Sequence, residues 1–289
     1  MVARAASEYA GGSAWTLDPL QLAAPLVLAW CYWLRVRGLA GTGRAPHRLR
    51  ELSFYAGVAV LALAVTSPID GIGEHRLFYV HMVQHLMLGD VAPLLIVLGL
   101  TGPVLRPLLA APGIMRLRGL AHPFVALPLW ALDLSLWHLP ALYEAALRSA
   151  GVHALEHALF FTTGALMWAS VVEPLPGPAW FGAGWKSIYT LAVRTVQGAV
   201  ANVFLWSSVA FYDAYAAGER ASGVSPLQDQ EIAGGIMLVE GAVVTLVVFA
   251  WLFLRWVRES ELSQAMIDSG QDPERSARAA RYRRSAARP

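Results

Sequence analysis

The sequence predicts an all-α fold, a bundle of seven membrane-spanning helices, and three observations lead to this prediction. The chain of 289 residues is 56% hydrophobic and only 15% charged, whereas a soluble domain usually carries about 25% charged residues. Apolar segments with the length of about 20 residues that a helix needs to cross a bilayer recur along the chain. No competing pattern of alternating polar and apolar residues indicates strands, and lipid otherwise admits only helices.

The predicted spans are 19–37, 51–68, 76–100, 120–138, 151–172, 187–211 and 232–257. No linker divides them, so residues 1–257 are expected to form one transmembrane domain. Residues 258–289 are rich in arginine and are expected to be a disordered cytoplasmic tail held near anionic lipid. Because this tail is short, the bilayer and not a nucleic acid is its expected partner.

The distribution of basic residues predicts the orientation of the bundle. Most of the 22 lysine and arginine residues follow the first, third and seventh spans or precede the sixth. The segments on the opposite side carry only Arg4, Arg76, Arg148 and Arg220. The positive-inside rule therefore places the N-terminus outside and the C-terminus in the cytoplasm, which agrees with an odd number of spans.

The first span is expected to direct membrane insertion, because the residues before it lack the regions of a cleavable signal peptide. This span holds the single cysteine, Cys31, which excludes an internal disulfide and a metal site with two thiolates. The second span, 51–68, then returns the chain to the outer side of the membrane.

The third span, 76–100, carries ionisable side chains inside an apolar run. The stretch HMVQHLMLGD begins in its outer half, and His81 and His85 of this stretch lie four positions apart and therefore share one helix face. His75 lies at the outer mouth of this span and is either a further metal ligand or a surface group.

The fourth and fifth spans bring further polar groups to the outer end of the bundle. The fourth span runs outward and ends at His138, with Asp133 about one turn deeper. The fifth span starts with HALEH, in which His153 and His157 share a face and Glu156 lies between them.

These side chains from three helices predict a metal site near the outer face. Ionisable groups inside a span are costly, and a functional site is their default interpretation, although a single histidine is often a hydrogen-bonded core group. Imidazole suits copper, zinc and iron. The predicted ligands are His81, His85, His138, His153 and His157. Asp133 and Glu156 are expected to orient these imidazoles as hydrogen-bond acceptors.

The sixth and seventh spans are expected to make contacts within the bundle. Asp90, in the inner half of the third span, lies at the same depth as Arg194 in the sixth span. Their opposite charges predict a buried ion pair with a structural role. Gly234 and Gly235 in the seventh span are expected to let another helix approach closely.

Five segments together resemble the cytochrome c oxidase assembly factor CtaG family. They are TSPID, HMVQHLMLGDVAPLLIVLG, LWHLPALYEAAL, HALEHALFFTTGALMW and LQDQEIAGGIM, and they lie between residues 50 and 257. The resemblance implies a multi-pass protein of the bacterial plasma membrane that helps to mature a haem–copper oxidase, whose subunits would be its partners. Asp90 departs from the family pattern, in which an apolar residue is expected.

The resemblance further implies that copper is the bound metal, with zinc as the alternative. The residues implicated are His81, His85, His153 and His157, with His138 beside them. The predicted function is therefore a non-enzymatic assembly factor that binds copper at an outward-facing histidine cluster and passes it to the oxidase.

Two other functions fit the same residues. HALEH matches the H-x-x-E-H pattern, in which two histidines bind zinc and the glutamate acts as a base, so an intramembrane zinc-dependent hydrolase is one alternative. A metal-free scaffold that holds an oxidase subunit is the other.

Overall fold

The structure, a computed structural model, describes residues 15–16, 18–111 and 118–282 of the chain. Within these residues the secondary structure is helical and contains no strand, which confirms the predicted all-α class. The helices of the first half are α2 (Pro19–Leu39), α3 (Arg48–Thr66), α4 (Pro68–His75), α5 (Phe78–Leu86), the π turn η1 (Met87–Val91), α6 (Ala92–Gly99), α7 (Gly102–Ala110), η2 (Arg118–Ala121), α9 (Pro123–Trp137) and α10 (Pro140–Arg148). Those of the second half are α11 (Ala150–Val172), α12 (Ala183–Trp206), η3 (Asp213–Tyr215), α13 (Ala216–Ser222), α14 (Pro226–Asp268) and α15 (Pro273–Tyr282).

Five helical segments in the described part of the chain are long and apolar enough to cross a membrane. They are α3, the continuous segment from α5 through α6, α11, α12 and α14. A sixth candidate is the pair α9 and α10, which reaches this length only in combination and bends by 73° between its two helices. The predicted first span forms α2, a helix of 21 residues that does not belong to this set.

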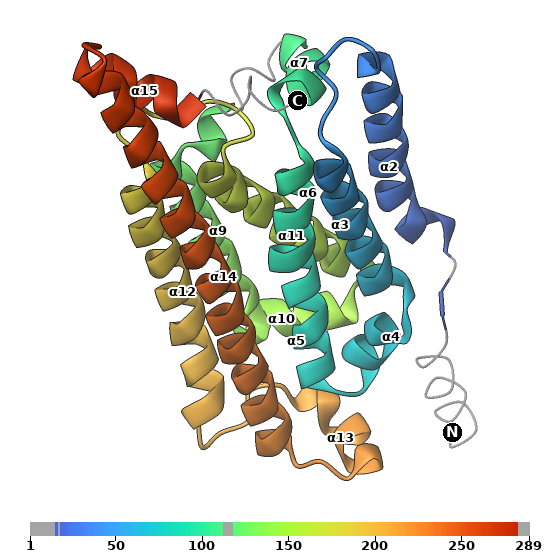
Figure 1. Ribbon diagram of the computed structural model, residues 1–289. Coiled ribbons are helices and arrows are strands. Elements are labelled where there is room, and N and C mark those ends of the chain that lie inside the picture. The colour runs from blue at the N-terminus through green and yellow to red at the C-terminus, as the bar shows by residue number, and fades with distance from the viewer. Residues whose placement is uncertain (1–14, 17, 112–117, 283–289) are drawn as a thin grey trace.

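The predicted fourth span, residues 120–138, contains α9, and the chain turns into α10 directly after it. Helix α9 ends at Trp137, and Pro140 then occupies the first turn of α10. Proline suits the start of a helix because its missing N–H would have no partner there. Helix α10 therefore runs across the bundle instead of continuing α9 (Figure 1).

The helices pack around the third span, which lies in the middle of the bundle (Figure 1). Helix α3 packs along α6, α11 packs against α6 and α9, and α14 packs along both α12 and α5. Helix α2 lies at the periphery of the bundle and packs mainly against α3 and α7. The third and fifth predicted spans, which carry the histidine pairs, are therefore direct neighbours.

A π turn brings α11 close to the third span. The backbone N–H of Ala92 donates to the carbonyl of Met87, five residues earlier, and Pro93 has no N–H to donate to Gly89. A Cβ atom at Gly164 of α11 would overlap the carbonyl oxygen of Gly89. The two backbones thus touch directly beyond the histidine pairs, which fixes the distance between the helices that carry them.

A second close contact joins α12 and α14. A Cβ atom at Gly234 would lie 2.6 Å from the carbonyl oxygen of Ala201, so only glycine allows this approach. At Gly235 a Cβ atom would meet no described atom within 4 Å. The predicted close approach is therefore correct for Gly234 and wrong for Gly235, which points away from the neighbouring helix.

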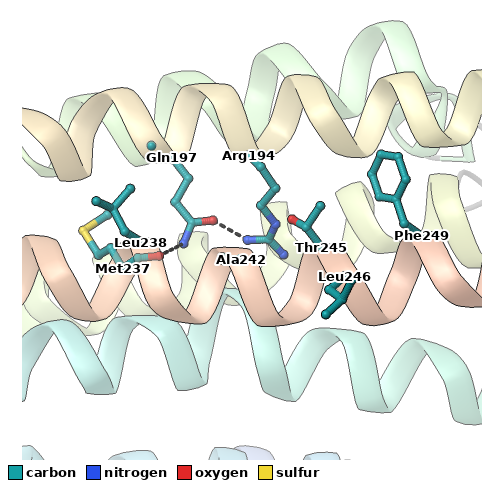
Figure 2. Close-up of a pocket in the computed structure, with 10 residues that line it drawn as sticks. Arg194, Gln197, Met237, Leu238, Ala242, Thr245, Leu246 and Phe249 are labelled. Carbon is teal, nitrogen blue, oxygen red and sulfur yellow. Dashed lines mark hydrogen bonds between the residues drawn. The ribbon is translucent and has the colours of Figure 1, made fainter.

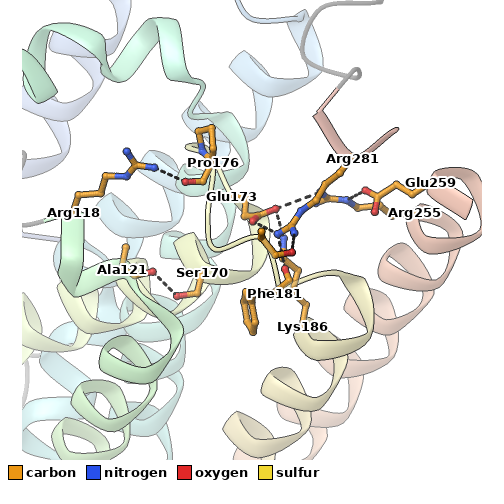
Figure 3. A network of polar contacts seen from close by, with 11 residues as sticks. Arg118, Ala121, Ser170, Glu173, Pro176, Phe181, Lys186, Arg255, Glu259 and Arg281 are labelled. Atoms are coloured by element: carbon orange, nitrogen blue, oxygen red, sulfur yellow. Dashed lines mark hydrogen bonds and ion pairs between the residues drawn. The ribbon is translucent and has the colours of Figure 1, made fainter. Parts of the chain in front are cut away.

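The described part of the segment from residue 258 onward is mostly helical, although its composition led us to expect disorder. Helix α14 continues to Asp268, and α15 follows. The reason is an ion-pair network in which Arg281 and Lys186 lie 2.5 and 2.6 Å from the carboxylate oxygens of Glu173 (Figure 3). Arg281, one of the arginines expected to face lipid head groups, thus fastens α15 to Glu173 at the end of α11 and to the segment before α12. Residues 283–289 of the predicted tail lie outside the described residues.

Candidate metal centre

A carboxylate from the start of α14 fixes the beginning of the helix that carries the first histidine pair. The backbone N–H groups of Phe78 and Tyr79 donate to Asp229 at 2.9 and 2.8 Å. The first N–H groups of a helix have no partner within the helix, so this carboxylate serves as the cap of α5. His81 and His85 follow within the next two turns.

Gln84 sets the rotation of the same helix. Its amide nitrogen donates to the carbonyl oxygen of Ala64 at 2.9 Å and to the carboxylate of Asp70 at 2.6 Å. Burial raises the pKa of the Asp70 carboxyl, and the hydrogen bond from Gln84 opposes this shift. Since Gln84 is held toward α3 and α4, His81 and His85 face α11 instead.

The two histidine pairs face each other across α5 and α11. The ring centroids are 4.3 Å apart for His81 and His85 and 4.1 Å apart for His153 and His157. The Nε2 atoms of His81 and His153 lie 3.3 Å apart. The structure therefore brings together the four histidines that the sequence places at one depth.

Four side chains in this cluster can offer ligand atoms to a single ion. One atom from each of His81, His85, Glu156 and His157 lies within 4.8 Å of the others. Ligands about 2.0 to 2.1 Å from a tetrahedral metal are roughly 3.3 Å apart, so small side-chain movements would complete such a site. Glu156, which was expected to orient the imidazoles, thus lies among the candidate ligand atoms.

Polar atoms around this point lack hydrogen-bond partners among the described residues, although His85 Nε2 lies 3.7 Å from Glu156 Oε1. Both ring nitrogens of His85, both carboxylate oxygens of Glu156 and the Nε2 atoms of His138 and His157 are buried without a hydrogen bond. Each such group costs about 1–3 kcal/mol. His138 Nδ1 lies 2.6 Å from the carbonyl oxygen of Leu134 and must donate to it, which leaves a lone pair on Nε2. This donor set fits a metal ion.

Two tyrosines that the sequence analysis does not single out support His81. The hydroxyl oxygens of Tyr143 and Tyr215 lie 2.6 and 2.8 Å from His81 Nδ1 and 2.7 Å from each other. Such contacts fix the ring orientation and leave Nε2 directed toward α11. A third tyrosine, Tyr212, donates to the carbonyl oxygen of His138 at 2.7 Å. The occurrence of Tyr143 in the segment LWHLPALYEAAL is the one sequence signal for this role.

Asp133 makes a different contact from the one expected. Its carboxylate accepts a hydrogen bond of 2.8 Å from the hydroxyl of Thr163, two turns beyond Glu156 on α11. Both residues are buried. Among the described contacts Asp133 fastens α9 to α11, and it does not hold an imidazole.

The side chains of Asp90 and Arg194 lie outside the histidine cluster and contact each other. Arg194 Nη1 is 2.6 Å from Asp90 Oδ2, and Trp168 Nε1 donates to Asp90 Oδ1 at 2.7 Å. Arg194 also contacts Gln197 on α12, and both line a pocket of about 490 Å³ between α12 and α14 (Figure 2). The pair ties the π turn to α12, so Asp90 has a structural partner in the bundle.

Comparisons with known proteins identify the family of the chain. The family model for the cytochrome c oxidase caa3 assembly factor matches residues 30–259. Two uncharacterized proteins, one from Mycobacterium bovis and one from Mycobacterium tuberculosis, are each 25% identical to the chain over 274 residues. These alignments cover 85% of this chain and 40% of each relative, so the chain spans less than half of their length. No solved structure matches the chain.

Proposed function

Because the chain belongs to the cytochrome c oxidase caa3 assembly factor family, we propose that it binds copper at the histidine cluster and passes it to an oxidase subunit. The ligands proposed are His81, His85, Glu156 and His157, with His153 and His138 beside them. The observation that carries this proposal is the group of ligand atoms within 4.8 Å of one another, where buried nitrogens and carboxylate oxygens lack hydrogen-bond partners. Copper would be the cargo of the protein.

The chemistry of the donors supports copper as the cargo. Imidazole suits copper well, and for nitrogen and oxygen donors copper binds more tightly than the other divalent first-row metals. The Glu156 carboxylate would neutralise one positive charge of the ion, which lowers the cost of burying it. Transfer by ligand exchange is favoured by the neighbouring imidazoles of His153 and His138, which can replace a ligand during release.

The proposal includes seven spans in a bacterial plasma membrane, with α2 as the first and α9 with α10 as the fourth. The arginine-bearing ends of α2 and α14 both lie at the top of Figure 1, on opposite sides of the bundle, and the N-terminal end of α5 lies toward the bottom. The positive-inside rule supports an orientation with the histidine cluster near the outer face, where the copper centres of terminal oxidases are reached. A C-terminal reporter that is active only in the cytoplasm tests this orientation.

Metal analysis of the purified full chain tests the proposed function. The wild type should retain about one copper ion per chain, and the His81→Ala/His85→Ala variant should lose it while still folding. The variant His47→Asn/His122→Asn is a matched control. It removes the same number of imidazoles, but asparagine can replace the side-chain acceptors that cap α3 and α9. The control should keep its copper.

Metal analysis, combined with a hydrolysis assay and with an assay of oxidase maturation in cells, separates the alternative functions. Bound zinc together with hydrolysis that depends on Glu156 would establish the hydrolase and contradict the proposal. Metal-free wild type, in cells where the double variant still supports oxidase maturation, would establish the scaffold instead.

A further inference from the structure

The histidine cluster is largely buried, since His157 alone among the four proposed ligands is partly exposed, so a metal ion needs a route into it. His81 and Glu156 have no exposed surface, and His85 is 4% exposed. An ion that reaches these residues must pass through side chains that can bind it on the way, because a bare ion is not stable in an apolar interior.

His153 connects the cluster with the end of α4. On one side its Nε2 atom lies 3.3 Å from His81 Nε2. On the other side its Nδ1 atom lies 3.9 Å from a carboxylate oxygen of Glu74. The ring therefore presents one nitrogen to the buried cluster and the other to the last turn of α4.

Glu74 in turn contacts a histidine at the surface. Its second carboxylate oxygen lies 3.8 Å from His75 Nε2. Side-chain exposure falls from 57% at His75 to 24% at Glu74 and 9% at His153. These three residues form a continuous row of metal-ligating atoms that leads from the surface to the buried cluster.

The spacing of this row suits ligand exchange. Two ligands that share an ion at about 2 Å each are up to about 4 Å apart, so an ion bound to one side chain can already contact the next. The separations between neighbouring side chains stay below that limit, from His75 through Glu74 and His153 to His81. Rotation of the His153 ring would carry the ion from its Glu74 side to its His81 side.

The packing of α4 keeps the row in register with α5. A Cβ atom at Gly73 would lie 2.8 Å from the Cα atom of His81, so the residue before Glu74 rests directly on the helix of the cluster. The hydrogen bond between Gln84 and Asp70 holds the other end of α4 to α5. The end of α4 is thus a built part of the site.

We propose that Glu74 and His75 form the receiving site of the metal, from which the ion passes through His153 into the buried cluster. This inference rests on the proposed function. The receiving site selects a partly hydrated cation or one offered by a donor with exchangeable ligands, because it supplies only one carboxylate and one imidazole. It sets the rate of loading and leaves the final affinity to the cluster.

The rate of copper uptake by the purified full chain tests this proposal. Copper sulfate, with and without ascorbate, is mixed with the protein, excess EDTA stops uptake after increasing times, and the bound copper is measured. The Glu74→Gln/His75→Ala variant should load about tenfold more slowly, which is the lower range of rate effects from guiding charges. Its final copper content should equal that of the wild type.

The variant Glu144→Gln/Arg148→Ala is a matched control. It removes an ion pair on α10 with similar side-chain exposure, 30% and 66%, in which the two side chains contact each other. Its loading rate should match that of the wild type.

Equal rates in the Glu74→Gln/His75→Ala variant and the wild type would overturn the receiving site alone. A lower final copper content in that variant would also overturn it, since Glu74 or His75 would then be a resident ligand. A wild type that binds no copper would overturn the proposed function itself.

Discussion

His81 on α5 and His153 on α11 meet through their Nε2 atoms, which lie 3.3 Å apart although the residues are 72 positions apart in the chain. Two nitrogen lone pairs at this distance repel each other unless one nitrogen carries a proton or an ion lies between or beside them. The other ring nitrogen of His81, Nδ1, lies within hydrogen-bond distance of two tyrosine hydroxyls. The His81 ring therefore cannot turn freely to avoid the contact. The contact is one step of the row from Glu74 to the buried cluster.

Removing a hydroxyl that holds His81 should weaken copper binding without unfolding the protein. Tyr143→Phe keeps the aromatic ring that packs at this position but loses the contact of 2.6 Å with His81 Nδ1. Residues that support a metal ligand typically contribute about 10- to 100-fold to affinity, and a loss of that size is expected here. Competition titration with a copper chelator measures it. Tyr55→Phe, on the partly exposed face of α3, is the control and should bind copper as the wild type does.

The contact between α11 and the π turn should be sensitive to a single methyl group. In Gly164→Ala the new Cβ atom would overlap the carbonyl oxygen of Gly89, so α11 must move away from the third span. Overpacking of this kind costs about 1–3 kcal/mol of unfolding free energy, and the displaced histidine pairs should bind copper more weakly.

Gly235→Ala provides the opposite case. Its Cβ atom would meet no described neighbour within 4 Å, and alanine loses less backbone entropy than glycine in a helix, by about 0.5–1 kcal/mol. This variant should therefore be as stable as the wild type or slightly more stable. If thermal unfolding showed the same destabilisation for both alanine variants, the close contact at Gly164 would not be the cause.

Substitutions of Glu156 and Asp133 should have different effects, on copper affinity and on stability respectively, although both carboxylates are buried. Glu156→Gln removes a charged ligand atom, so copper affinity should fall by at least the roughly 10- to 100-fold that a supporting residue contributes. Asp133→Ala removes the acceptor of the Thr163 hydroxyl and should cost about 1–3 kcal/mol of stability with little change in copper stoichiometry. Copper content and unfolding temperature should be measured for both variants. A loss of copper in Asp133→Ala together with unchanged copper binding in Glu156→Gln would show that the roles are exchanged.

The ion pair between Asp90 and Arg194 should be costly to break on one side only. Arg194→Met leaves a buried carboxylate without its closest cation and should lower the unfolding free energy by about 3–5 kcal/mol. The double variant Asp90→Leu/Arg194→Met should recover most of that loss, because the Asp90 carboxylate is then absent and Glu240, which lies 3.8 Å from Arg194 Nη1, keeps its hydrogen bond from Gln197. A double variant no more stable than Arg194→Met would show that the two residues act independently.

Local spacing was sufficient to predict the main components of the site. The pairs His81 with His85 and His153 with His157 follow from helical periodicity, and their similar depth follows from the position of each pair near the start of its predicted span. Charge and depth together were sufficient to relate Asp90 to Arg194. These properties depend on short segments, which the sequence displays directly.

Contacts between distant segments could not be predicted in this way. The cap that Asp229 provides for α5 joins residues about 150 positions apart, and the hydroxyls of Tyr143 and Tyr215 reach His81 only through the bend after α9 and the loop before α14. The helical course of α15 depends on Glu173, which lies 108 positions before Arg281. Composition alone favoured disorder for that segment because it gave no information about this partner.

X-ray absorption spectroscopy at the copper edge of the purified, copper-loaded full chain tests the central claim most directly. Coordination by histidine and Glu156 side chains should give a shell of nitrogen and oxygen donors at about 2.0 Å, with the multiple-scattering pattern of imidazole and no sulfur shell. In the His81→Ala/His85→Ala variant this signal should disappear together with the bound copper. A wild type whose copper is bound by sulfur at about 2.3 Å, or that binds none, would contradict the account.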